Sequence, residues 1–183
     1  MEISLTVPFN KDDLEKLRTG DEVLLSGVIY TARDAAHKRF IAALDSGKEL
    51  PLDLSGQVLY YTGPTPARPG QVIGSAGPTT SYRMDRYTPR LLDDCGLKAM
   101  IGKGSRADSV VEAIKRNRAV YFSAIGGAGA LIASCVVSCD VVAYNDLGAE
   151  AVHKLEVSNM PLVVTIDSNG TIFQTGGESA FNG

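Results

Sequence analysis

A lysine stands between two glycines at a point of the sequence where a strand is expected to end. Lys103 lies between Gly102 and Gly104 in MIGKG, directly after a short apolar run. Free backbone N–H groups in such a turn, together with the start of a following helix, favour an anion. The alternative is a solvated lysine in an ordinary glycine turn, and this motif alone does not decide between the two.

Hydroxyl groups cluster in GPTTSYRMD, where Gly77 and Pro78 stop a strand and Thr79 leads into a helix. Hydroxyl groups at a helix start commonly serve as caps. Arg83 follows Thr79 by four residues and lies close to it if the first turn is helical. Because an arginine can hold a carboxylate through two parallel hydrogen bonds, this pair predicts a carboxylate pocket.

A third candidate, YTARDAAHKR, begins a helix directly after a strand. Arg33 and His37 lie four residues apart and would share one helix face, while Asp34 suits the positive end of the helix dipole. Arg33 is the better candidate for contacting a substrate, because an isolated histidine is usually structural or exposed.

Two other kinds of site are disfavoured. Gly102, Gly104 and Ala107 satisfy the pattern G-x-G-x-x-A, but the next strand, AVYFSAIGG, ends without the acidic residue that a dinucleotide site needs. Cys135 and Cys139 could share a helix face, yet no nearby histidine or third cysteine completes a tetrahedral metal site. We therefore expect no metal site in this chain.

Composition restricts the class of protein. The chain has 183 residues, 44% of them apolar, which suits one domain, and its net charge of -3 argues against nucleic acid or an anionic membrane as partner. Three cysteines fit a reducing compartment, and no secretory signal is visible, so we expect a cytoplasmic protein. The uncharged stretch 119–139 could span a bilayer by length, but its glycines predict a buried strand, a turn and a buried helix.

Periodicity predicts an α/β fold, because strands alternate with helices from residue 97 onward and this order favours a parallel sheet. Strands are expected at 22–32, 97–104, 119–127 and 139–146, and helices at 33–44, 106–118 and 128–137. Less regular expectations are a strand, short helix and turn over 1–21, two strand-like runs over 57–77, a helix over 78–96 ended or kinked before Pro89, and a hairpin at 167–170. We expect a single domain over 1–183 with a disordered tail at 176–183.

Taken together and in order, these motifs resemble a known family. YTARDAAHKR, GPTTSYRMD, MIGKG, VYFSAIGGAGALIA, LGAEAVHKLEV and MPLVVTIDSNG are similar to the carboxyl-terminal domain, or beta subunit, of the iron–sulfur class of fumarases and tartrate dehydratases. The resemblance extends from about Gly20 to Gly176.

This resemblance implies a swivelling three-layer β/β/α domain, with a central parallel sheet and a second, mostly antiparallel sheet. It also implies a 4Fe-4S cluster held by a partner alpha subunit and none bound by this chain, within a homo-oligomer or a heterotetramer. The implied reaction is the reversible hydration of fumarate to (S)-malate. The alternatives are the beta subunit of an L(+)-tartrate dehydratase and a non-catalytic module that binds dicarboxylates.

The family's site residues fall on four positions of this sequence. By resemblance, Thr79 is the base at the substrate carbon, while Arg33, Arg83 and Lys103 bind the substrate carboxylates. Cations placed there would stabilise the negative charge that develops next to a carboxylate when a proton leaves the neighbouring carbon. Fumarate is preferred as substrate because AGPTTSYRMD, LGAEAVHKLEV and VTIDSNGTIFQTG are more similar to fumarases than to tartrate dehydratases.

Overall fold

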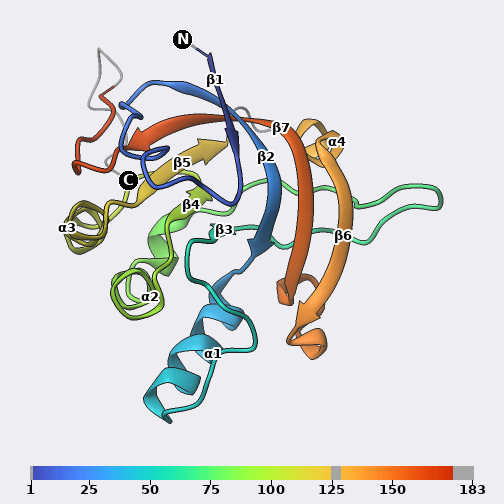
Figure 1. Ribbon diagram of the computed structural model, residues 1–183. Helices are drawn as coiled ribbons and strands as arrows, with labels where there is room; N and C mark the ends of the chain where they lie inside the picture. Colours follow the sequence, from blue (N-terminus) through green and yellow to red (C-terminus); the bar gives the residue numbers. More distant parts are fainter. Residues whose placement is uncertain (1, 125–128, 175–183) are drawn as a thin grey trace.

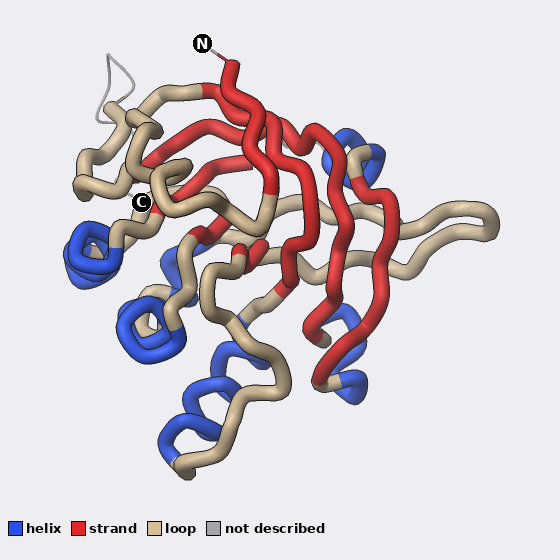
Figure 2. The backbone as a smooth tube through the Cα atoms, in the orientation of Figure 1, coloured by secondary structure: helices blue, strands red, loops and turns tan. Residues whose placement is uncertain are grey.

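The computed structural model describes residues 2–124 and 129–174, in which seven strands form one mixed sheet (Figures 1 and 2). The strands are β1 (Glu2–Thr6), β2 (Glu22–Thr31), β3 (Val58–Tyr60), β4 (Ala99–Gly102), β5 (Val120–Ala124), β6 (Val136–Ala143) and β7 (Val152–Ile166). The helices are α1 (Asp34–Asp45), α2 (Thr88–Cys95), α3 (Asp108–Asn117) and α4 (Gly129–Ser134), with 3-10 turns η1 (Ser81–Met84) and η2 (Asn145–Glu150).

The first five strands run parallel to one another in the order β1-β2-β3-β4-β5. The long strand β7 is antiparallel to three others: it pairs with β2 through residues 154–163, with β5 through 162–166, and with β6 through 152–157. Because β7 pairs with both β2 and β5, strands β2, β3, β4, β5 and β7 form a closed ring of hydrogen-bonded neighbours. Strand β6 lies at an edge of the described sheet.

Each short parallel strand is buried on both faces, because its alternate side chains enter two different cores. On β4, Ile101 belongs to an inner core enclosed by the ring of strands, whereas Met100 faces the helices. On β5, Phe122 and Tyr121 divide in the same way. These strands are therefore continuous apolar runs in the sequence, because both faces are buried and no face needs polar side chains toward solvent.

Helices α1, α2 and α3 cover one side of the parallel strands (Figure 1). Their apolar faces supply Phe40, Leu91 and Ile114 to the helix-side core, and all three side chains are fully buried. Pro89 lies in the first turn of α2, where the absence of its N–H costs no hydrogen bond. The predicted helix over 78–96 is therefore two separate helical segments, and Pro89 begins the second of them instead of ending the first.

A long loop, called the arm and comprising residues 63–76, projects away from the body of the molecule (Figure 1). Its base is held by the Thr65 N–H donating to Ser75 O over 2.9 Å and the Gly74 N–H donating to Thr65 O over 3.1 Å. The first predicted run of the 57–77 segment is β3. The second is part of the arm and is not a strand, since its proline and glycine residues oppose a continuous ladder.

Three further expectations need correction. The segment 11–16 forms turns and not a short helix. The predicted helix over 128–137 ends at Ser134, because the β-branched Val136 begins β6, so Cys135 and Cys139 do not share a helix face. The turn at 167–170 is present, but Ile172 makes only one bridge, to Ile166, in place of a second strand.

Some expectations lie outside the described residues, namely the Gly126-Gly127 turn and the disordered tail at 176–183. The remaining predicted strands and helices are present, with ends that shift by a few residues. Two of their expected properties were wrong: in α4 only Ile132 is buried, and β6 pairs antiparallel with β7 rather than joining the parallel strands. Within 2–124 and 129–174, no helix combines the length and the apolar character needed to cross a bilayer.

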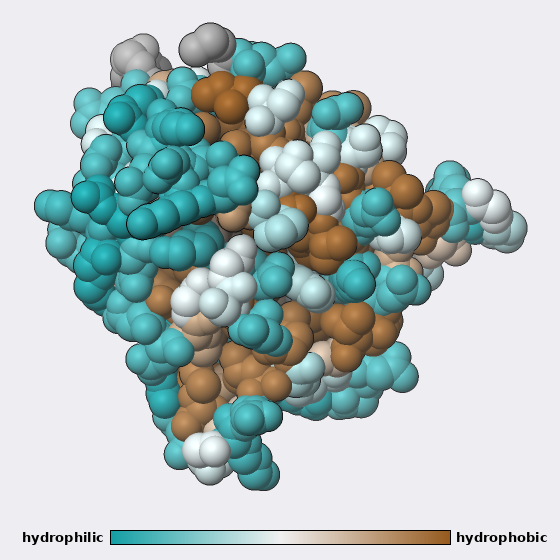
Figure 3. Space-filling view, viewed as in Figure 1, coloured by the Kyte–Doolittle hydropathy of each residue, from teal (hydrophilic) through white to brown (hydrophobic). Residues whose placement is uncertain are grey.

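Polar and apolar surfaces are unevenly distributed on the face shown in Figure 3. Hydrophilic side chains cover the side above α3, while hydrophobic patches appear mainly over the middle and the side where β7 and β6 lie (Figures 1 and 3). On β6, Val137, Val141 and Val142 are 54%, 44% and 42% exposed.

The two-core arrangement predicts that Phe122→Ala will strongly destabilise the fold. Phe122 is fully buried in the inner core, and its truncation should lower the free energy of unfolding by about 3 to 5 kcal/mol. Val137→Ala on the exposed face of β6 is the control and should change it by less than about 0.5 kcal/mol. Urea unfolding measures both values, and equal effects would contradict the assignment of Phe122 to a packed core.

Candidate functional site

A cavity of about 600 Å³ opens where several parallel strands end on the same side of the sheet. In open α/β sheets, ligands bind outside the carboxyl ends of the strands. Arg33 follows β2, Lys103 follows β4, and Ala124 ends β5. We call this space the strand-end cavity; Gly63, Ser75 and Thr79 are among its other lining residues.

Arg33 is placed at the cavity by the junction between β2 and α1. The Ala32 N–H donates to Tyr60 O over 3.1 Å, which extends the β2–β3 ladder to the residue before Arg33. Gly63 leaves room for the arginine, because a Cβ there would lie 2.9 Å from Arg33 Nη1. The nearest acid is Glu150, whose Oε1 is 3.9 Å from Arg33 Nε, beyond hydrogen-bond length. The guanidinium therefore retains the capacity to bind a carboxylate.

Thr79 is held against the end of β3 by its own main chain. Its N–H donates to Tyr61 O over 2.7 Å, and the Thr62 hydroxyl donates to Gly77 O over 2.7 Å. The Tyr60 hydroxyl donates to Ala76 O. Three successive residues of one strand end thus hold the backbone before Thr79, and this leaves its half-buried side chain at the cavity wall.

Lys103 lies in the glycine turn after β4, opposite the segment that carries Thr79. The Ser81 N–H donates to Lys103 O over 2.9 Å, and the Lys103 N–H donates to Ser81 Oγ over 3.1 Å. A side chain at Gly102 would collide with Ser81, since its Cβ would lie 1.9 Å from Ser81 Oγ. Lys103 itself is exposed, and the ion pairs of the described residues do not include it.

The fourth predicted residue, Arg83, does not line the strand-end cavity. Its Nη2 is 3.5 Å from Asp34 Oδ2, and the two residues border a separate hollow of about 470 Å³ with Tyr82. Thr80, the residue before η1, has an extended ψ of 122°, so Thr79 is not part of the first turn and the four-residue spacing does not bring it over Arg83. The structure therefore brings three of the four predicted residues together, and their roles stay a prediction.

The side chains of the strand-end cavity suit an anion and not a metal ion. Arg33 and Lys103 are permanent donors without an acceptor atom, and Thr79 offers one neutral hydroxyl. Among residues 2–124 and 129–174, no group of three or more histidine, cysteine or acidic residues could hold a metal ion. Burial also raises the pKa of the Cys95 and Cys139 thiols, which keeps them protonated. An iron–sulfur cluster does not fit the ligands of this part of the chain.

Residues 1–176 match the sequence model of the family described as Fumarase C-terminus. The chain belongs to this family. Three relatives illustrate its range. A protein of Methanocaldococcus jannaschii, assigned as an L(+)-tartrate dehydratase subunit beta, is 41% identical over 165 residues, which cover 87% of this chain and 85% of that protein.

The other two relatives are much longer than this chain. A Geobacillus stearothermophilus protein assigned as a class I fumarate hydratase is 35% identical over 172 residues, which cover 92% of this chain and 32% of the relative. The anaerobic class I fumarate hydratase of Escherichia coli is 37% identical over 150 residues, which cover 81% of this chain and 27% of the relative. This fumarase C-terminus chain thus spans about a third of the fumarate hydratases that it matches.

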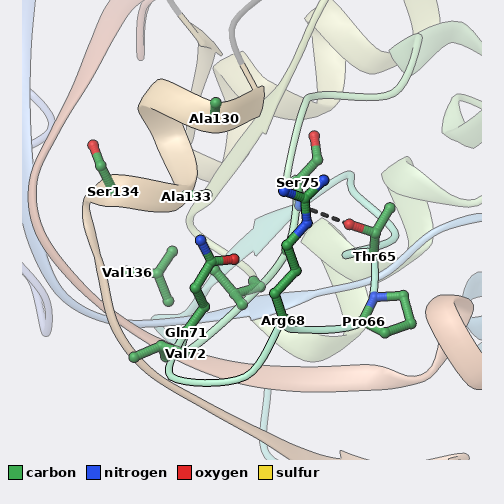
Figure 4. A pocket seen from close by; sticks show the side chains of 12 residues that line it. Thr65, Pro66, Arg68, Gln71, Val72, Ser75, Ala130, Ala133, Ser134 and Val136 are labelled. Atoms are coloured by element: carbon green, nitrogen blue, oxygen red, sulfur yellow. Dashed lines mark hydrogen bonds between the residues drawn. The ribbon is translucent and has the colours of Figure 1, made fainter.

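A second cavity of about 550 Å³ adjoins the strand-end cavity in this fumarase C-terminus chain. Figure 4 shows Arg68 and Gln71 of the arm on one side and Ala130 and Ser134 of α4 on the other. Thr65 and Ser75 at the base of the arm line both cavities, and the Ser75 N–H donates to Thr65 Oγ1 over 2.6 Å (Figure 4). The arm thus forms one wall of the site.

Some residues that shape the site were missed at the level of sequence. Gly63 and the hydroxyls of Tyr60 and Thr62 hold or admit the predicted residues, and all three lie at the end of a buried strand, in LYYTGP. That position was a usable signal, because strand ends border ligand sites in parallel sheets.

His37 does not reach the strand-end cavity, although it shares the first helical turn with Arg33. Its ring is fully buried between Tyr61 and Tyr87, and its Nδ1 donates to Arg33 O over 2.8 Å. Burial lowers the pKa of His37 to about 4. In this chain His37 is therefore neutral, and its ring stabilises the backbone of Arg33 from inside the protein.

The buried histidine predicts a loss of stability in mild acid. Between pH 6.5 and about 4, the unfolded chain binds a proton at His37 and the folded chain does not, so the free energy of unfolding falls as pH falls. From pH 7 to pH 5 the wild type should lose about 2 kcal/mol more than His37→Gln. Urea unfolding of both proteins at both pH values measures this difference, and identical losses would exclude a neutral His37.

Proposed function

We propose that this chain is the beta subunit of an iron–sulfur hydro-lyase and supplies the substrate-binding half of the active site. The observation that carries the proposal is the meeting of Arg33, Thr79 and Lys103 at one cavity: Arg33 and Lys103 follow the ends of β2 and β4, and Thr79 is hydrogen-bonded to Tyr61 O just after β3. Two cations and one hydroxyl in a single pocket suit a small dicarboxylate, and the class of reaction follows from the family. The preferred reaction is the reversible hydration of fumarate to (S)-malate.

The charge distribution supports a division of roles within the cavity. Hydration moves a proton at a carbon next to a carboxylate, so negative charge spreads onto that carboxylate in the transition state. Arg33 and Lys103 would bind the carboxylates and stabilise this charge, and Thr79 would exchange the proton. A threonine hydroxyl is a weak base, so the nearby cations are needed to favour its ionised form. Arg83 would contribute only after leaving Asp34.

A partner subunit would complete the site. The described residues that line the strand-end cavity suit a carboxylate and not a metal, so the 4Fe-4S cluster of the family would be held by the alpha subunit and supply Lewis-acid chemistry there. The M. jannaschii relative supports the subunit reading, because it carries the description of a beta subunit and is 85% covered by this chain. We also propose that the whole chain is one domain of the swivelling three-layer β/β/α type.

L(+)-tartrate is the second candidate substrate. The relative that favours it is again the M. jannaschii protein, which is assigned as a tartrate dehydratase subunit and shares 41% identity with this chain. Both substrates are four-carbon dicarboxylates and would use the same two cations. They differ in their hydroxyl groups, so relative rates on the two compounds separate the two candidates.

The first test is reconstitution of activity. The isolated chain should show no hydratase activity, and anaerobic mixing with a cluster-bearing alpha subunit should produce turnover of fumarate, with slower turnover of L(+)-tartrate. The alpha subunit alone is the control. Turnover of fumarate by this chain alone would overturn the half-site proposal. A complex that assembles and binds fumarate without turnover would instead support a non-catalytic dicarboxylate module.

The second test separates two adjacent hydroxyl groups. In the reconstituted complex, Thr79→Ala should lower kcat by a factor of about 100 or more, because it removes the proposed proton-transfer group. Thr80→Ala is the matched control, since Thr80 caps η1 without a side-chain hydrogen bond and should leave kcat nearly unchanged. Steady-state kinetics measure kcat, and gel filtration shows whether each complex has assembled. Normal rates in both variants would exclude Thr79 from proton transfer.

A further inference from the structure

Tyr121 is a buried tyrosine on β5 that does not line the strand-end cavity but touches the turn that carries Lys103. The residue is fully buried, and its hydroxyl oxygen lies 2.9 Å from Ser81 Oγ and 2.9 Å from Gly104 O. Ser81 in turn contacts both backbone groups of Lys103. A single phenol therefore links the segment after Thr79 to the turn after β4.

The donors and acceptors of this link form an ordered chain. Gly104 O can only accept, so the single phenol proton of Tyr121 serves this carbonyl when the Ser81 hydroxyl donates to the phenol oxygen. Ser81 Oγ then accepts the Lys103 N–H at 3.1 Å. In this arrangement every hydroxyl donates once and accepts once, and consecutive bonds of this kind strengthen one another in a buried environment.

Before the turn, Gly102 pairs with Ser123 of β5, and Lys103 forms a parallel bridge with Thr80, whereas Gly104 depends on the Tyr121 hydroxyl. Gly102 and Gly104 flank Lys103, and Gly104 has a φ of 84°, a conformation that glycine adopts without strain. Glycine also gains the most conformational freedom when its contacts are lost. The direction of the exposed Lys103 side chain therefore depends on the hydrogen bonds that its backbone and that of Gly104 make.

The ion pair of Arg106 and Asp85 packs against the Tyr121 ring and holds it in place. The Arg106 guanidinium lies 4.8 Å from the centre of the Tyr121 ring, and its Nε donates to Asp85 Oδ1 over 2.6 Å. Asp85 Oδ2 also accepts the Ala107 N–H over 2.7 Å, so this ion pair fixes the backbone just beyond the turn. Burial raises the pKa of Tyr121 to about 12, which keeps the phenol protonated and able to donate near neutral pH.

We propose that Tyr121 is a positioning residue, whose hydroxyl holds the Gly102–Gly104 turn so that Lys103 meets Arg33 and Thr79 at the substrate. The catalytic consequence of this inference rests on the proposed function. Its structural part concerns only the backbone of the turn and can be measured on the chain alone. Tyr121 acts through Lys103 and does not contact the substrate.

The structural part is tested by amide hydrogen exchange of the isolated chain. In Tyr121→Phe the Ser81 hydroxyl and Gly104 O each lose a partner, so exchange of the Lys103 amide should become at least about tenfold faster. Tyr30→Phe, which removes the hydroxyl of a half-buried tyrosine on β2, is the matched control and should leave the Lys103 amide unchanged. Unchanged exchange in Tyr121→Phe would overturn the inference.

The catalytic part is tested by a double-mutant cycle in the reconstituted complex. Tyr121→Phe should lower kcat/KM for fumarate by roughly ten- to a hundredfold, with unfolding still cooperative. In a Lys103→Ala background the same change should have almost no further effect, because the residue through which Tyr121 acts is already gone. Equal losses in the two backgrounds would reveal a merely structural role and overturn the inference. A wild-type complex without hydratase activity would overturn the proposed function, and the exchange experiment would then decide whether Tyr121 holds the turn.

Discussion

The main chain at Tyr60 and Tyr61 is hydrogen-bonded on both sides, and the candidate site depends on these few bonds. Tyr60 O accepts the N–H of the residue before Arg33, and Tyr61 O accepts the N–H of Thr79. The Tyr61 N–H donates to the end of β4, two residues before Lys103. Because backbone bonds of this kind have little freedom, three segments far apart in the sequence are held at one edge of the sheet.

The burial of the parallel strands on two faces makes this edge rigid. Side chains of β3, β4 and β5 alternate between the inner core and the helix-side core, so neither face of these short strands is free to move. The long strand β7 closes the ring by pairing with both β2 and β5. Cations can then extend from short loops at the strand ends while the backbone that carries them stays fixed.

The site combines this rigid base with an incomplete set of chemical groups. Arg33 and Lys103 line the cavity, and Glu150 lies 3.9 Å from Arg33 Nε, whereas Arg83 lies outside the cavity, 3.5 Å from Asp34 Oδ2. Two cations at an open cavity favour a dianionic ligand and its transition state. The ligands for a metal cluster are lacking in the described part of the chain, which is consistent with a role as one half of a composite site.

The sequence by itself determined the family, the order of most strands and helices, and three residues that meet at one cavity. Local motifs marked only possible anion sites, because glycine turns after apolar runs mark strand ends and parallel strand ends lie side by side; the resemblance to the family selected the individual residues. Only the tertiary structure decided which cations are available: Asp34 and Arg83 pair across two segments, and His37 is enclosed by aromatic rings. Pairing and burial depend on contacts between residues far apart in the chain, which residue spacing along one segment does not encode. For the same reason, only the fold revealed that Tyr121 lies against the turn of Lys103.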